Sequence, residues 1–187
     1  MAFTLLALIL IVAIGTVVVL NLPSFGKLPS GERLARIEQS PNYREGHFQN
    51  LSETPDLTPT GSQFSLFYNY FFPNTKDLYP QKPLPTVQTE LGLLPDNTWV
   101  WFGHSSYLMN IEGKRVLIDP VFHSASSFSF IVKPFEYTYT YTPEDMPQEI
   151  SLLVLTHDHW DHLDYKTMKA IKDRVQQVVC PVGVGSH

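Results

Sequence analysis

The sequence predicts a layered α/β domain that is preceded by one membrane-spanning helix. The N-terminal segment 2–20 is almost wholly apolar. From residue 98 onwards, short apolar segments typical of strands alternate with one segment of helical periodicity. One strand-like segment then leads directly into a loop rich in histidine and aspartate. Alternation of strands with a helix is typical of domains in which a helical layer packs against a sheet.

Residues 1–22 are predicted to form a transmembrane anchor. No charged residue occurs from Met1 to Gly26, and about 20 helical residues cross a hydrocarbon core about 30 Å thick. A cleavable signal peptide is the alternative, but no Lys or Arg precedes the apolar run and no clear small-x-small cleavage site follows it. The basic residues that follow the span are Lys27, Arg33, Arg36 and Arg44. The positive-inside rule therefore predicts a single-pass membrane protein with its catalytic part in the cytoplasm.

Residues 23–97 are predicted to form an irregular arm, because they hold ten of the fifteen prolines. Proline removes a backbone donor and fixes φ, so long regular elements are not expected, with residues 32–39 as a short helical exception. Within the arm, the aromatic segment 64–72 either packs onto the core or meets lipid or an acyl chain. The arm is expected to leave the membrane and to wrap the catalytic domain.

Residues 98–187 carry the pattern of a catalytic α/β domain. The expected strands are 98–102, 106–111, 115–118, 151–155 and 177–180, with a turn at 112–114 and a long loop or irregular hairpin over 124–142. Asp164 is a candidate cap for a helix that runs to about Arg174. Met168, Ile171 and Val175 would form its apolar stripe.

The strand at 151–155 delivers a hexad with the pattern His-x-His-x-Asp-His. Neutral imidazole and carboxylate are preferred ligands of borderline metals such as zinc. In an extended or tightly turning loop, His157 and His159 can project to the same side and bind one ion, while Asp161 and His162 hold a second. Two ions about 3.5–4 Å apart form the clamp of many phosphate and acyl ester hydrolases. The alternative is a solvated, histidine-rich turn.

The hexad resembles the signature of the metallo-β-lactamase superfamily. The segments 101–106 (Trp-Phe-Gly-His-Ser-Ser) and 116–122 (Val-Leu-Ile-Asp-Pro-Val-Phe) look like the branch that contains N-acylphosphatidylethanolamine-hydrolysing phospholipase D and its bacterial relatives. The resemblance covers about residues 45–187. It implies the N-terminal half of an αββα sandwich with two Zn²⁺ ions at one rim. Members of this kind draw further ligands from beyond this point, so the chain looks like the N-terminal half of a longer protein.

Beside the hexad, Asp119, His104 and the ligand Asp161 are the candidate catalytic residues. The resemblance places Asp119 near the metal pocket, where it could hold a ligand histidine in one tautomer; turn formation before Pro120 is the alternative. His104 either supports the ligands or is a structural histidine bonded to backbone. A Ser-His-Asp mechanism is disfavoured because no Gly-x-Ser-x-Gly frame surrounds His104.

Together these observations predict a zinc-dependent hydrolase, a membrane-associated phosphodiesterase that attacks a lipid-like phosphodiester with a metal-bound hydroxide. Its expected partners are membrane lipid and a small-molecule or lipid phosphodiester. Nucleic acid is not expected, because the net charge is -5. The alternatives are another hydrolase of the same fold, such as a lactonase, or an inactive, truncated membrane protein stabilised by metal. The oligomeric state stays open.

Overall fold

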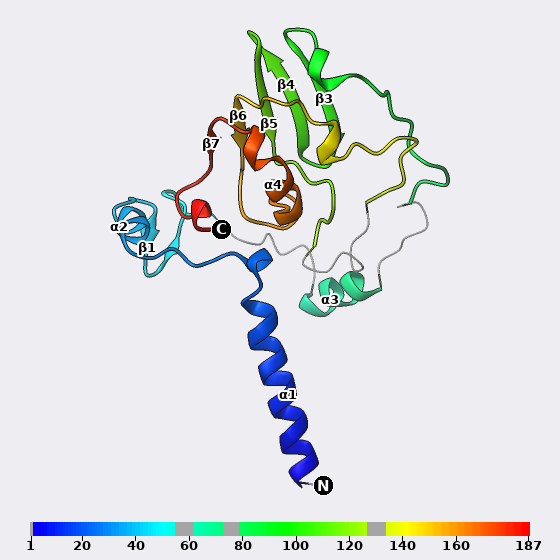
Figure 1. Ribbon diagram of the computed structural model, residues 1–187. Helices are drawn as coiled ribbons and strands as arrows, with labels where there is room; N and C mark the ends of the chain where they lie inside the picture. The colour runs from blue at the N-terminus through cyan, green and yellow to red at the C-terminus, as the bar shows by residue number, and fades with distance from the viewer. Residues whose placement is uncertain (1, 55–61, 73–78, 127–133) are drawn as a thin grey trace.

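The computed structural model describes residues 2–54, 62–72, 79–126 and 134–187. Helix α1 (Ala2–Leu20) projects as a single rod from the rest of the chain (Figure 1). Its window Phe3–Leu20 has a mean hydropathy of 3.0 and is exposed throughout, so α1 is long and apolar enough to cross a membrane. A 3-10 turn, Pro23–Phe25, follows and leads into the arm.

The part of the chain from residue 98 onwards is built on one five-stranded sheet. Its strands are β3 (Thr98–Gly103), β4 (Ser106–Ile111), β5 (Lys114–Ile118), β6 (Leu152–Val154) and β7 (Val178–Val179), in the order β3-β4-β5-β6-β7. The pairs β3–β4 and β4–β5 are antiparallel, whereas β5–β6 and β6–β7 are parallel. The sheet is therefore mixed, with its parallel part around β6.

The two halves of this sheet form in different ways, and local sequence explains the antiparallel half. Glu112 and Gly113 both have positive φ angles, 51° and 72°, as a tight hairpin turn between β4 and β5 requires. Strand β6 instead comes from a distant part of the chain and sits between β5 and β7 as a short apolar segment. All five predicted strands are present, with β6 and β7 shorter than expected.

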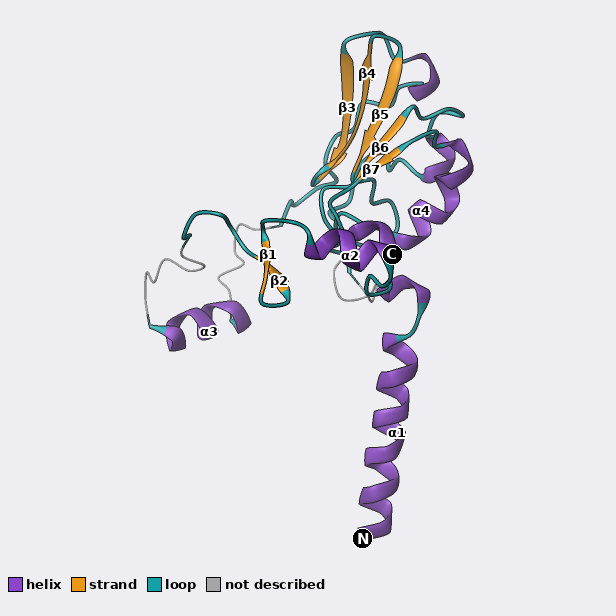
Figure 2. Cartoon of the chain, turned by 90° about the vertical axis from the view of Figure 1, so that its left-hand side faces the viewer, coloured by secondary structure: helices purple, strands orange, loops and turns teal. Residues whose placement is uncertain are grey.

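Helix α4 (Tyr165–Ile171) covers one face of the sheet (Figure 2). Asp164 caps it by accepting a hydrogen bond from the Lys166 backbone N–H at 3.1 Å, which confirms the predicted cap. The helix ends earlier than predicted and continues as a 3-10 turn, Lys172–Arg174. Ile171 is fully buried in a core that it shares with Leu91, Leu108, Leu117, Met146, Ile150 and Leu153.

The opposite face of the sheet is open over β3. Trp99 and Trp101 keep 65% and 58% of their surface exposed. The described residues thus provide a sheet with helix on one face, which fits half of the predicted αββα sandwich. The complete sandwich stays a prediction.

The arm is more regular than the proline content predicted. It contains α2 (Glu32–Glu38), a small hairpin of β1 (Tyr43–Arg44) and β2 (His47–Phe48), and α3 (Gln63–Phe71). The expectation that 32–39 would be the exception was therefore wrong for residues 63–71, where Ser62 caps a nine-residue helix by accepting from Ser65 N–H at 3.1 Å. The helix forms because Ser62 caps its N-terminus and no proline lies within it.

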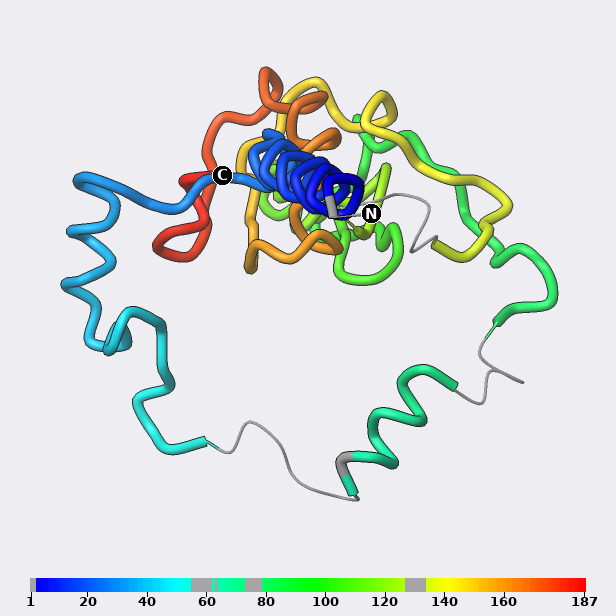
Figure 3. Tube along the Cα trace, turned by 90° about the horizontal axis from the view of Figure 1, so that it is seen from below, coloured from blue at the N-terminus to red at the C-terminus, as the bar shows by residue number. Residues whose placement is uncertain are grey.

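The aromatic side chains of α3 do not pack onto the catalytic core. Phe67, Phe71 and Phe72 keep 61%, 57% and 65% of their surface exposed, and seen from below α3 lies apart from the sheet (Figure 3). A different piece of the arm does reach the domain: the Leu84 N–H donates to Glu136 O at 2.7 Å, and Leu84 O accepts from Thr138 N–H at 2.9 Å. The arm thus wraps the domain through its 84–89 segment rather than through its aromatic helix.

Candidate metal centre

Three separate segments bring the candidate site together. Asp119 directly follows β5, the hexad follows β6 after Leu155 and Thr156, and His104 lies in the turn between β3 and β4. Because β5 and β6 are parallel neighbours, their carboxyl ends meet at the same edge of the sheet. That edge is where loops with side chains for chemistry gather in open α/β sheets.

Asp119 is completely buried behind the hexad. Its carboxylate accepts hydrogen bonds from the Thr156 N–H at 2.8 Å and from the Thr156 hydroxyl, and its Oδ2 lies 2.8 Å from His162 Nδ1. A carboxylate in this position favours a proton on Nδ1 and leaves Nε2 free to act as a ligand. The geometry therefore matches the tautomer-holding role predicted for Asp119.

The backbone at Asp119 is also held in an unusual conformation. Its φ is 39°, in the left-handed region that a non-glycine residue seldom adopts. The Ser106 hydroxyl donates to Asp119 O at 2.6 Å and accepts from the Val121 N–H at 3.1 Å, which fixes the chain on both sides. Such conformations persist where surrounding contacts over-determine them, and they concentrate at functional sites.

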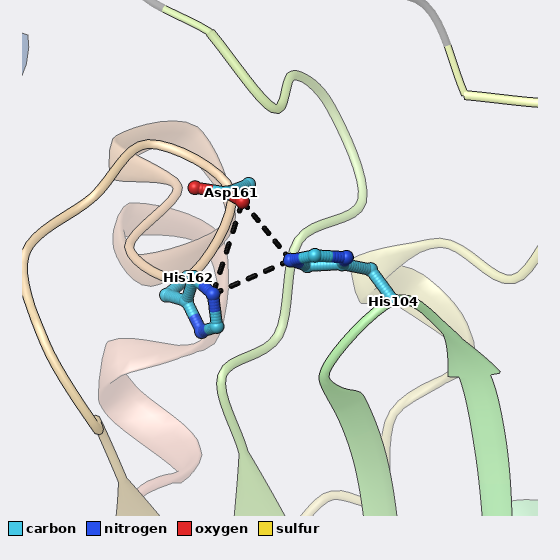
Figure 4. Close-up of side chains that lie close together, drawn as sticks. All are labelled: His104, Asp161 and His162. Atoms are coloured by element: carbon cyan, nitrogen blue, oxygen red, sulfur yellow. Dashed lines mark hydrogen bonds and ion pairs between the residues drawn. The ribbon is translucent and has the colours of Figure 1, made fainter. Parts of the chain in front are cut away.

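His104, Asp161 and His162 form the clearest donor group among the described residues (Figure 4). His104 Nε2 lies 2.9 Å from Asp161 Oδ2 and 3.3 Å from His162 Nε2, and the three donor atoms lie within 4.8 Å of one another. Two imidazole nitrogens and one carboxylate oxygen suit a borderline divalent ion such as Zn²⁺. The three side chains could therefore hold such an ion together.

His104 contributes one of the three donor atoms and does not merely support the other two side chains. It also has a positive φ, 43°, and the preceding Gly103 has a φ of 114°. A Cβ at Gly103 would lie 2.8 Å from the Tyr137 hydroxyl, so glycine is needed at this turn. The exposed Trp101 indole N–H donates to His104 O at 2.9 Å and holds the turn in place.

His157 and His159 lie next to this group. Their ring centroids are 4.6 Å apart, and the rings of His157 and His162 are 3.9 Å apart. A tight turn reverses the chain between the two halves of the hexad, because His159 O accepts from the backbone N–H groups of His162 and Leu163 at 3.0 and 2.8 Å. The four predicted ligands lie near one another, but the three-donor group contains only Asp161 and His162 of the four, so their convergence on common ions stays a prediction. The assignment of two ions to two pairs stays a prediction.

Sequence reasoning missed Thr156 and Ser106 as supports of the site. Thr156 directly precedes the hexad, and its hydroxyl also lies 3.0 Å from His157 Nδ1 and 3.3 Å from His162 Nδ1. Position next to the ligands was the one signal that could have indicated it. Ser106 carried no signal, because its role depends on a contact to residue 119 across two strands.

Asp164 does more than cap α4. Its buried Oδ2 accepts from the His123 N–H at 2.8 Å, from the Phe122 N–H at 3.3 Å and from the Thr167 hydroxyl at 2.6 Å. These bonds tie the loop after Asp119 to the start of the helix after the hexad. The two segments that carry the site are thus joined behind it.

The geometry defines the site as a candidate metal centre at the rim of an α/β domain. Residues 99–183 match the family described as "Beta-lactamase superfamily domain". This part of the chain belongs to the metallo-β-lactamase superfamily, which confirms the resemblance carried by the hexad.

Relatives place the chain beside metal-dependent hydrolases. An uncharacterized protein of Mycobacterium bovis is 33% identical over 153 residues, 80% of this chain and 41% of that protein. The N-acyl-phosphatidylethanolamine-hydrolyzing phospholipase D 1 of Caenorhabditis elegans is 34% identical over 46% of this chain and 24% of its own length. A protein of Sulfurisphaera tokodaii called a metal-dependent hydrolase is 32% identical over 34% of this chain and 23% of its own.

The chain spans less than half the length of these relatives. Among solved structures, CmlA, a diiron β-hydroxylase from Streptomyces venezuelae, is 29% identical over 46% of this chain and 15% of that chain, with a TM-score of 0.34. That overlap is too small to carry an argument about chemistry.

Proposed function

We propose that the protein is a zinc-dependent phosphodiesterase that works at a membrane on a lipid-like phosphodiester. The observation that carries the proposal is the convergence of His104, Asp161 and His162 at one sheet edge, with Asp119 behind His162. Membership of the superfamily and the metal-dependent hydrolase relative support hydrolysis. The phospholipase D relative from Caenorhabditis elegans supports a lipid phosphodiester as the substrate class.

In this proposal the residues divide into two donor pairs. His157 and His159 hold one ion; Asp161 and His162 hold the other, with His104 as an additional donor. When bound, divalent zinc supplies a water of lowered pKa, about 7, and positive charge opposite the phosphate. Asp119 keeps the His162 proton on Nδ1 so that Nε2 faces the ions, and Thr156 keeps Asp119 in place.

The membrane part of the proposal rests on two apolar surfaces. Helix α1 is long enough to span a bilayer, and α3 exposes aromatic side chains near the level at which α1 ends (Figure 1). Aromatic side chains with a polar tip are favoured at membrane interfaces, where the ring contacts apolar lipid and the tip contacts water. The basic residues after α1 put the catalytic domain on the cytoplasmic side in this proposal.

Metal analysis and a phosphodiesterase assay of the full-length protein test the proposal. We expect bound zinc and hydrolysis of a phospholipid-like diester. We expect the double variant His157→Ala/His159→Ala to bind less zinc, because it loses the ligands of one ion, and to lose the hydrolysis. His47→Ala is the matched control, because His47 is an exposed histidine in β2, outside the site. Unchanged zinc content and turnover in the double variant would show that the assignment is wrong.

A second candidate is hydrolysis of another substrate by the same residues, such as a lactone. The metal-dependent hydrolase relative favours this reading as well, since its name specifies no substrate. A panel of phosphodiesters and lactones separates the two candidates. Faster turnover of lactones would favour the second.

A further inference from the structure

A cavity of about 650 Å³ lies between the end of α1 and the loop that carries the metal ligands. Its walls come from the segment 23–26 that follows α1, residues 158–160 of the hexad, Leu163, α4 with the turn that follows it, and His187. Figures 1 and 2 both show the end of α1 directly below α4. The volume lies in the range of sites that enclose small organic ligands, about 300–1,000 Å³.

The inner walls of this cavity are apolar. The rings of Phe25 and Trp160 meet edge to face with centroids 5.0 Å apart, so the segment after the anchor packs on the metal-site loop itself. Leu163 and Met168 line the same cavity and pack against the domain core behind it. A hydrocarbon chain would find a continuous apolar surface here.

The rim of the cavity is charged and adjoins the metal site. Lys169 of α4 and Lys172 of the turn that follows it line the cavity and are exposed, which places two cations beside the apolar walls. His159 of the hexad lines it too. Asp158 contributes the opposite charge but pairs with His187 at 3.4 Å. A partly apolar pocket that includes the predicted ligand His159 and is flanked by lysines suits a molecule with a hydrocarbon chain and a phosphate.

The cavity also lies close to the bilayer that α1 would cross. Phe25 is five residues beyond Leu20, the last residue of α1. Five residues span at most about 18 Å even when fully extended, and the 3-10 turn Pro23–Phe25 shortens that distance. The headgroup layer on one side of a bilayer is itself about 5–8 Å thick. A lipid would therefore need to rise only partly from its leaflet to reach the cavity.

We propose that this cavity binds the acyl chain of a membrane phospholipid and presents its phosphate to the metal site. The segment 23–26 acts as both the end of the anchor and a wall of the pocket. The inference rests on the proposed function, since it takes α1 as membrane-spanning and the hexad as the reactive centre. It adds a location for the lipid and a route of entry from the side of the bilayer.

Quenching of Trp160 fluorescence by brominated acyl chains tests this location without reference to turnover. The full-length protein, with every other tryptophan including Trp99 and Trp101 changed to phenylalanine, is reconstituted in vesicles of phosphatidylcholine and phosphatidylglycerol. We expect chains that carry bromine to quench most of the Trp160 emission relative to unbrominated vesicles of the same headgroups. Soluble glycerol phosphate, which has the phosphate without the chain, should not displace the lipid.

Two variants separate binding in the cavity from simple proximity to the membrane. Met168→Glu places a carboxylate in the apolar wall, and Lys169→Glu/Lys172→Glu reverses the charge of the exposed rim without touching the core. Both should reduce quenching, and both should raise KM for a vesicle phosphodiester about tenfold. Val87→Glu is the control, because it makes the same kind of change at an exposed apolar residue outside the cavity.

The outcomes distinguish this inference from the proposed function. Emission of Trp160 that is unaffected by bromine, or quenched equally in wild type and both cavity variants, would overturn the inference whatever the protein hydrolyses. Variant-sensitive quenching in a protein that hydrolyses no phosphodiester would support the lipid site and overturn the proposed function.

Discussion

The carboxylate of Asp119 and the imidazole of His162 meet at 2.8 Å, although 43 residues separate them in the chain. The contact exists because β5 and β6 are adjacent parallel strands, and the segments that follow them carry the two residues. It links a fully buried, left-handed backbone position to a side chain that faces the candidate metal site.

Loss of the Asp119 charge should weaken metal binding. In Asp119→Asn the side chain still fits, and asparagine tolerates the positive φ, but its neutral amide stabilises a proton on His162 Nδ1 less than the carboxylate does. We expect zinc affinity or activity to fall about 10–100-fold, measured by competition with a chromophoric chelator. Asp158→Asn, an exposed carboxylate within the hexad, is the control, and an equal effect of the two changes would contradict the role of Asp119.

Replacement of His104 tests whether it belongs to the donor group. His104→Asn keeps a residue that tolerates the left-handed φ of 43° while it removes the imidazole 2.9 Å from Asp161. We expect lower occupancy of the second ion and a loss of activity, with the melting temperature of the metal-free protein unchanged. Metal analysis of wild type and variant checks this. Full occupancy and full activity in the variant would make His104 a structural residue of the turn.

Asp164 should be a stability residue of the domain rather than a reactive one. Asp164→Ala leaves the His123 and Phe122 N–H groups and the Thr167 hydroxyl without their buried acceptor, and removes the cap of α4. The expected cost is about 3 kcal/mol in the free energy of unfolding, from urea denaturation. Asp173→Ala, an exposed aspartate in the following turn, should cost far less.

The pH dependence of stability should carry a contribution from Asp145. Burial acts to raise the pKa of this carboxyl, but hydrogen bonds from the Tyr139 hydroxyl and from the Thr142 N–H and hydroxyl outweigh it and hold the pKa below the ordinary value. A depressed pKa stabilises the fold above the unfolded value of about 3.9, and this stabilisation disappears as pH falls through the folded pKa.

The variant Asp145→Asn isolates that contribution. At neutral pH it should be less stable than wild type by about 1 kcal/mol, as expected for a weakened capping box. Below about pH 4 the two proteins should converge, because protonation of the aspartate removes the same charge. Urea denaturation at a series of pH values measures this, and a difference that stays constant down to acid pH would show that the Asp145 charge is irrelevant.

Much of the domain was predictable because its signals are local. The alternation of β4, the Glu112–Gly113 turn and the Asp164 cap each depend on a few neighbouring residues. Helix α3 was not predicted, because the high proline content of residues 23–97 argued against regular elements. The N-cap at Ser62 was not recognised. The short lengths of β6 and β7 depend on pairing with distant strands, which no local pattern records.

The site likewise contains some residues that the sequence indicated and others that it did not. The hexad predicted a metal site, because histidine and aspartate occupy five of its six positions. The place of His104 in the donor group could not be read from sequence, since it depends on the β3–β4 turn that brings residue 104 to residues 161 and 162. Thr156 donates two hydrogen bonds to the Asp119 carboxylate, and Ser106 donates one to the Asp119 backbone carbonyl. Such supports have no spacing to recognise.

The most direct measurement of the central claim is an anomalous difference map at the zinc edge from crystals of the zinc-loaded full-length protein. The account requires anomalous peaks within coordination distance, about 2.0–2.2 Å, of the His157, His159, Asp161 and His162 side chains. A well-ordered hexad with no peak beside it, or zinc bound only elsewhere, would contradict the account.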